Sequence, residues 1–162
     1  MQTLLPIAER IAKQLIARKE TLAVAESSTG GLISASLLAV PGASAYFLGG
    51  AVVYTRFSRA ALVNITDADM AGIRAASEPY VTLLANRIRQ QLDATWSIGE
   101  TGAAGPSGNR YGDPAGHTCI AVLGPRERVI TLRTGLADRQ QNMRAFAQRA
   151  LELLEQTIAA KV

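Results

Sequence analysis

Cysteine and histidine are almost absent from this sequence, because Cys119 and His117 are the only ones among its 162 residues. No disulfide can form within the chain, and a zinc site made of several cysteines and histidines is excluded. Carboxylates alone can hold Mg²⁺ or Ca²⁺, but the sequence has no D-x-D-x-D loop. The composition therefore gives no support for a metal centre.

Aromatic residues are also scarce, at 5% of the chain, and no apolar run is long enough to cross a membrane. The stretch from Thr3 to Ile16 is interrupted by charged and amide side chains, so it fits neither a signal peptide nor a membrane span. The net charge of +4 comes mostly from fourteen scattered arginines rather than a basic block. We expect a cytoplasmic protein with no nucleic-acid partner and no membrane.

The length and composition fit one globular domain covering residues 1–162. Apolar spacing predicts helices over 4–18, 29–39, 57–63, about 68–74, 79–92 and from 138 onward, and strands over 21–25, 48–55, 95–100, 117–123 and 129–133. Strands separated by helices favour a parallel core with helices on both faces, and the last two strands add an antiparallel part. The pattern predicts an α/β fold with a mixed, mostly parallel sheet of about five strands.

Three segments with unusual composition follow predicted strands: Glu26–Gly31, Tyr54–Arg59 and Thr101–Gly116. In sheets of this kind, the ligand crevice lies outside the carboxyl ends of the parallel strands. We therefore expect the three segments to meet at one edge of the sheet.

The first of these segments, AESSTGG at residues 25–31, joins a predicted strand to a predicted helix. Free backbone N–H groups at a helix start can hold a phosphate, a carboxylate or an oxyanion, and Ser27 would stand beside them. The alternative is that Ser28 or Thr29 only caps the helix. The segment alone favours capping, because it lacks both the G-x-S-x-G spacing of a hydrolase elbow and the lysine of a phosphate-binding loop.

Other candidates are equally open to two interpretations. Small residues in Gly102–Gly108 allow a close approach to an anionic or planar ligand, or they form a plain surface loop. His117 could be a general base, but a half-buried strand histidine is the simpler interpretation, and Cys119 is expected to pack on the same side. Arg139 and Arg144 could clamp a phosphate or be solvated.

Seven short segments occur in one order along the chain. They are AESSTGG, Pro41–Phe47, Val52-Val53-Tyr54 entering a helix, Ser77-Glu78-Pro79, Gly102-x-Ala104-Gly105-Pro106, the strand entry at Gly116, and Asp138-Arg139. Together they resemble the CinA C-terminal domain family, which includes the bacterial nicotinamide mononucleotide deamidases. The family commonly has AES-C-TGG at the first segment. The resemblance runs from the first predicted helix to the last.

The resemblance implies a three-layer α/β/α fold and hydrolysis of nicotinamide mononucleotide to nicotinic acid mononucleotide and ammonia, without a metal or organic cofactor. Ser27 would be the nucleophile, with Tyr54 and Arg59 beside it as catalytic candidates. A homo-oligomer is expected. The residues implied to bind this pyridine nucleotide are Glu26, Ser28, Thr29, Gly30, Gly31, Gly102, Ala104, Gly105, Pro106, Arg139 and Arg144.

The sequence departs from the deamidases five residues beyond Tyr54, where they carry a lysine and this chain has Arg59. A serine hydroxyl needs a base to take its proton, and a guanidinium, which stays protonated, cannot serve. None of the three lysines, Lys13, Lys19 and Lys161, is placed to help unless a second subunit supplies one.

Three possibilities remain for the chemistry of Ser27. Tyr54, activated by Arg59, or Glu26 could act as the base. Arg59 could instead stabilise negative charge during a slow reaction. The third possibility is a protein that binds a nucleotide without deamidating it.

Overall fold

The computed structural model describes residues 2–160 and contains one five-stranded sheet in the order β2-β1-β3-β4-β5. The strands are β1 (Leu22–Glu26), β2 (Phe47–Val52), β3 (Trp96–Ala103), β4 (His117–Leu123) and β5 (Arg128–Arg133). β1 pairs in parallel with both β2 and β3, whereas β4 pairs antiparallel with both β3 and β5. The predicted α/β fold with a mixed, mostly parallel sheet of about five strands is therefore confirmed.

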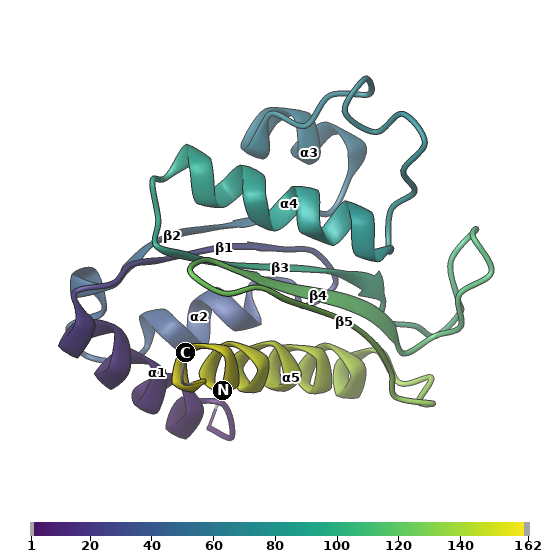
Figure 1. The fold of residues 1–162 in the computed structure, drawn as a ribbon. Helices are drawn as coiled ribbons and strands as arrows, with labels where there is room; N and C mark the ends of the chain where they lie inside the picture. Colours follow the sequence, from purple (N-terminus) through teal and green to yellow (C-terminus); the bar gives the residue numbers. More distant parts are fainter. Residues whose placement is uncertain (1, 161–162) are drawn as a thin grey trace.

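Helices cover both faces of this sheet (Figure 1). One face carries α1 (Leu5–Arg18), α2 (Leu32–Leu38) and α5 (Arg139–Ala159), and the other carries α3 (Arg56–Val63) and α4 (Glu78–Gln91). Side chains of β1 alternate between two apolar clusters, Leu22 and Val24 on the first face and Ala23 and Ala25 on the second. The chain thus forms the three α/β/α layers that the strand and helix pattern favours.

The structure contradicts the predicted helix over 68–74. The segment makes successive short turns instead, in which the N–H groups of Met70, Ala71 and Ile73 donate to carbonyl oxygens three residues earlier. Gly72 adopts a φ of +74°, a left-handed conformation that ends helical propagation. Apolar spacing alone did not reveal this break.

The helix predicted over 29–39 begins later, at Leu32, and neither Ser28 nor Thr29 caps it. Residues 27–31 form a turn between β1 and α2, so the short apolar pattern overestimated the helix by about one turn. At the start of the last helix, the Asp138 side chain accepts the N–H of Gln141 at 2.8 Å and so caps α5. Within residues 2–160, no helix combines the length and apolarity needed to cross a membrane.

Candidate functional site

The carboxyl ends of β1, β2 and β3 lie at one edge of the sheet, where the three expected segments meet around two cavities. The first, here the Ser27 cavity, has a volume of about 220 Å³ and includes Ser27, Tyr54, Arg59 and Thr101 in its wall. The second, here the Ser28 cavity, has a volume of about 230 Å³ and includes Ser28, Tyr54 and Arg139. The two neighbouring serines therefore line different cavities, and Tyr54 belongs to both.

A larger hollow of about 710 Å³ is lined by residues of α3 and by Thr66 and Asp67. It contains neither serine, nor any residue of the loop after β3. We take the two strand-end cavities as the candidate site, because nucleophilic hydroxyls and fixed cations converge there.

Two buried carboxylates accept hydrogen bonds from the turn between β1 and α2. The parallel register pairs Ala25 with Gly99, so Glu26 and Glu100 follow at neighbouring strand positions. Both residues have no exposed surface. Their side chains take up polar groups of the turn that would otherwise be buried without partners.

Glu26 accepts the N–H groups of Gly31, Ile33 and Ser34 at 2.9–3.1 Å, and the hydroxyl of Ser34 at 2.6 Å. Its negative charge therefore lies at the N-terminus of α2, where the partial positive charge of the helix stabilises it. Glu26 lines neither cavity. Its position does not support the expectation that it binds a ligand or acts as the base for Ser27.

Glu100 was missed by the sequence analysis. It accepts the N–H groups of Ser27 and Thr29, both at 3.0 Å, and the hydroxyls of Ser28, Thr29 and Thr118. The signal that could have revealed it is an acidic residue at the end of a buried strand, beside a neighbouring strand that also ends in glutamate. Its contacts make Glu100 the main support of the serine turn.

These carboxylates overturn the expectation that the start of α2 is free to hold an anion. The N–H groups of Ser27 and Thr29 point to Glu100, that of Gly31 points to Glu26, and that of Gly30 donates to the Ser27 carbonyl. Thr29 is fully buried, and its hydroxyl lies 2.6 Å from Glu26. These four N–H groups are therefore not free for an anionic ligand, and arginine side chains supply the positive charge at the two cavities.

Arginines and tyrosines provide the wall of the Ser27 cavity. Arg59 has 13% of its side chain exposed and lies over the Tyr80 ring, with its guanidinium carbon 6.0 Å from the ring centre. Within residues 2–160, its Nε atom is buried and has no hydrogen-bond partner. An unsatisfied buried donor costs about 1–3 kcal/mol, so the position of Arg59 in this wall carries a cost in folding stability.

No group among residues 2–160 forms a hydrogen bond with the Ser27 hydroxyl. Burial raises the pKa of Tyr80, against the opposing effect of Arg59, so Tyr80 is a donor rather than a base near neutral pH. Tyr54 is 60% exposed, and its hydroxyl accepts a hydrogen bond from Nη2 of Arg139 at 3.2 Å.

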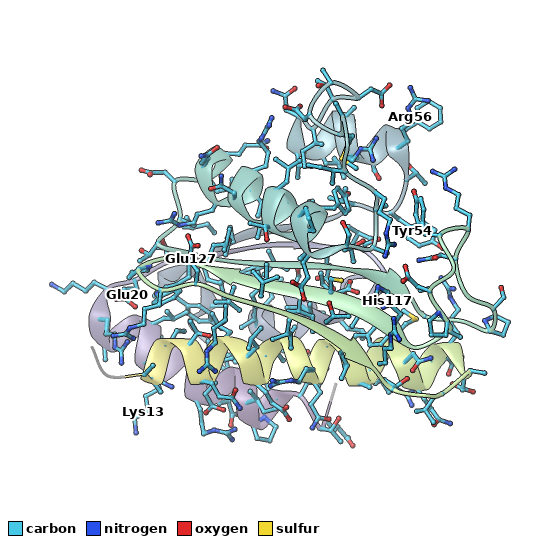
Figure 2. All side chains as sticks on the ribbon, turned by 45° about the vertical axis from the view of Figure 1, so that its right-hand side comes forward. Lys13, Glu20, Tyr54, Arg56, His117 and Glu127 are labelled. Carbon is cyan, nitrogen blue, oxygen red and sulfur yellow. The ribbon has the colours of Figure 1, made fainter. Side chains whose placement is uncertain are left out.

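None of the lysines that the structure describes lies near Ser27 in the fold. Figure 2 shows Lys13 at the end of the molecule opposite Tyr54, and Lys19 lies at the C-terminal end of α1, before β1 begins. Lys161 lies outside the described residues.

The Ser28 cavity is built by the glycine-rich loop and the start of α5. Nη1 of Arg139 donates to the Gly105 carbonyl at 2.9 Å, so the arginine links this loop to Tyr54. Gly105 has a φ of +113°, and a side chain there would collide with the Ala137 carbonyl. Gly102 and Ala104 also line this cavity, as expected.

Pro106 follows Gly105 but is absent from the lining of either cavity. Arg144 lies beside a separate hollow with Leu32, Gln140 and Met143. Gly30, like Glu26, Thr29 and Gly31, lines neither strand-end cavity. The structure thus brings together Ser27, Ser28, Tyr54, Arg59, Arg139 and part of the glycine-rich loop, and it leaves these other candidates outside.

A charged anchor fixes the loop that places Arg110 and Tyr111 in the Ser27 cavity. Arg74 contacts both oxygens of Asp113, at 2.6 and 3.2 Å, and Asn109 donates to the same carboxylate at 2.8 Å. The Arg74 hydrogen bond lowers the pKa of Asp113 against the effect of burial.

His117 and Cys119 lie beside this anchor. His117 is 3% exposed, and its Nε2 lies 2.9 Å from the Ala76 carbonyl. Burial raises the pKa of the Cys119 thiol, as fits a packing residue. Neither residue lines the two cavities, so the structure favours the packing interpretation for both.

Comparison with known proteins agrees with this architecture. Residues 4–158 match the family model described as the CinA C-terminal domain. A CinA-like protein from Gloeobacter violaceus is 36% identical over 154 residues, covering 94% of this chain and 36% of the relative. A CinA-like protein from Anaeromyxobacter is 38% identical over 146 residues, covering 90% and 36%. The chain thus spans about a third of the length of these relatives.

Solved structures show the same fold. The competence damage-inducible protein A from Klebsiella pneumoniae superposes with a TM-score of 0.91 at 26% identity, covering 98% of this chain and 99% of that one. A CinA superfamily protein from Enterobacter cloacae gives a TM-score of 0.89 at 27% identity, covering 96% and 92%.

Proposed function

Because the chain belongs to the CinA C-terminal domain family, we propose that its strand-end site binds a pyridine mononucleotide and hydrolyses a carboxamide on the pyridine ring, with Ser27 as nucleophile. The observation that carries the proposal is the meeting of the Ser27 side chain with aromatic and cationic side chains in one cavity. The substrate would be nicotinamide mononucleotide, and the products would be nicotinic acid mononucleotide and ammonia.

The two cavities suit the two ends of such a molecule. Tyr54, Tyr80 and Tyr111 offer flat walls for a ring in the Ser27 cavity. The guanidinium of Arg139 and the small residues of the loop suit a phosphate in the Ser28 cavity. Ser27 would attack the carboxamide carbon, and the tetrahedral intermediate would release ammonia and leave an acyl-enzyme for water to hydrolyse.

Proton transfer is the weak part of this reaction. Tyr54 shares the Ser27 cavity and, as the phenolate, would take the serine proton and pass it to the nitrogen that leaves as ammonia, whereas Arg59 would stabilise negative charge on the reacting oxygen. Loss of an optimal general base costs about 10²–10⁴-fold in rate, so turnover would be slow.

A second function, nucleotide binding without turnover, is favoured by one observation: Arg59 lines the Ser27 cavity at the position where the deamidases carry lysine. The two functions separate in one experiment. Purified protein is incubated with nicotinamide mononucleotide, and ammonia and the product acid are measured over time.

Ammonia release that disappears in Ser27→Ala, but persists in Ser44→Ala in the short helix before β2, supports the hydrolase. Saturable binding without ammonia supports the second function, and Arg59→Lys should then raise the activity if lysine is the missing group. Absence of both binding and turnover would reject both functions.

A further inference from the structure

The charges around the Ser27 cavity are unbalanced. Arg56, Arg59 and Arg110 line it, and no aspartate or glutamate among the described residues does. A neutral carboxamide needs no such surplus of positive charge. A cavity lined by cations concentrates anions, and its field is strengthened by low-dielectric walls.

The three arginines differ in how fully they are already engaged. Arg56 makes a two-point contact with Asp67, one arm of which is Nε to Oδ1 at 3.0 Å, and 72% of its side chain is exposed. Arg110 donates to the Tyr111 hydroxyl at 2.9 Å. Arg59 only reaches Asp67 with Nη2 at 3.4 Å, and its buried Nε has no partner within residues 2–160. Arg59 has 13% of its side chain exposed, whereas Arg56 and Arg110 are exposed, so a contact between Arg59 and a ligand anion would be the least screened by water.

A guanidinium has five N–H donors and no acceptor. A carboxylate matches this pattern with two acceptor oxygens, whereas a carboxamide offers one oxygen and an NH₂ group that would face other donors. The tyrosines leave room for a flat ring next to that contact, and the Ser28 cavity with Arg139 lies on the other side of Tyr54.

We infer that the Ser27 cavity is selective for a carboxylate, so that the preferred ligand is an aromatic-acid mononucleotide with its carboxylate on Arg59 and its phosphate on Arg139. The inference rests on the proposed nucleotide site and deepens it. If Ser27 hydrolyses the amide, the acid product is held more tightly than the substrate and limits turnover. If Ser27 does not react, the site is a sensor or carrier for the acid.

The decisive measurement is calorimetric titration of the wild-type protein with nicotinic acid mononucleotide and, separately, with nicotinamide mononucleotide at pH 7.5. We expect the acid to bind at least about 10-fold more tightly, as a charge-assisted contact requires. Equal affinities, or tighter binding of the amide, would overturn the inference and leave the proposed nucleotide site in place. Binding of neither compound would instead reject the nucleotide site itself.

Variants assign the preference to one side chain. Arg59→Gln should remove most of the preference for the acid while changing the affinity for the amide less than about threefold. The matched control is Arg144→Gln, because Arg144 lies beside a separate hollow. It should keep the preference, and an equal loss in both variants would contradict the role of Arg59. Circular dichroism confirms that each variant is folded.

Discussion

The two sides of the turn between β1 and α2 differ in charge and in how completely their polar groups are paired. On the inner side, Glu26 and Glu100 are fully buried, and all four of their carboxylate oxygens accept hydrogen bonds. On the cavity side, the side chain of Arg59 makes one hydrogen bond within the described residues, a long contact with Asp67 at 3.4 Å. A completed network stabilises the fold, whereas an incomplete one is available to a ligand. Substitutions on the two sides should therefore affect different measurements.

The largest expected effect is on the inner side. Glu100→Ala would leave the N–H groups of Ser27 and Thr29 and the hydroxyl of Ser28 without their acceptor, and should lower the free energy of unfolding by about 3 kcal/mol or more. Urea denaturation measures this, with Glu127→Ala in the exposed turn after β4 as the control, expected within about 0.5 kcal/mol of wild type. A loss below about 1 kcal/mol would mean that water replaces the carboxylate.

The next effect is on the cavity side. Arg139→Gln should weaken binding of a pyridine mononucleotide by about 10-fold or more, equivalent to about 1.4 kcal/mol, because a charged contact to the phosphate is lost. Arg144→Gln on the same helix is the control, since Arg144 lies beside a different hollow. Equal weakening by both variants, measured by calorimetry, would place the phosphate elsewhere.

The adjacent serines give the finest contrast between the two sides. Ser28→Ala removes a hydroxyl that donates to buried Glu100 and should lower the free energy of unfolding by about 1 kcal/mol. Ser27→Ala removes a hydroxyl that faces the cavity and should change it by less than about 0.5 kcal/mol. Thermal denaturation compares them, and the reverse order would show that the structure assigns the two hydroxyls to the wrong sides.

The smallest effect concerns the Asp113 anchor. The hydrogen bond from Arg74 is the main cause that lowers the pKa of Asp113 in the folded protein. The ionised Asp113 carboxylate therefore stabilises the folded state at pH values above the usual aspartate pKa, and this contribution is lost as the pH falls through the pKa of the folded protein. Arg74 has 41% of its side chain exposed, and solvent screening limits the contribution to about 0.2–1 kcal/mol.

Asp113→Asn tests this dependence. Its difference in unfolding free energy from wild type should be constant above about pH 4.5 and shrink below it. If the difference in unfolding free energy grew as the pH fell, it would contradict the lowered pKa of Asp113.

The sequence was sufficient to predict the α/β class, the strands and the meeting of three loops, because burial of apolar residues follows secondary-structure periods. It failed where tertiary partners decide the local structure. Thr29 and Gly31 looked like ligand-binding groups because nothing in AESSTGG reveals that Glu100, about 70 residues away, takes the N–H of Thr29. Likewise, the contribution of Tyr80 and Tyr111 to the Ser27 cavity depends on how α4 and the loop after β3 fold over it.

The positive charge in both cavities comes from arginine rather than lysine or histidine. A guanidinium keeps its proton across the pH range in which proteins remain folded. The attraction of these cavities for an anionic ligand therefore stays the same as the pH changes within that range. A profile of affinity against acidity would trace the ionisation of the bound molecule, and so help to identify its chemical class.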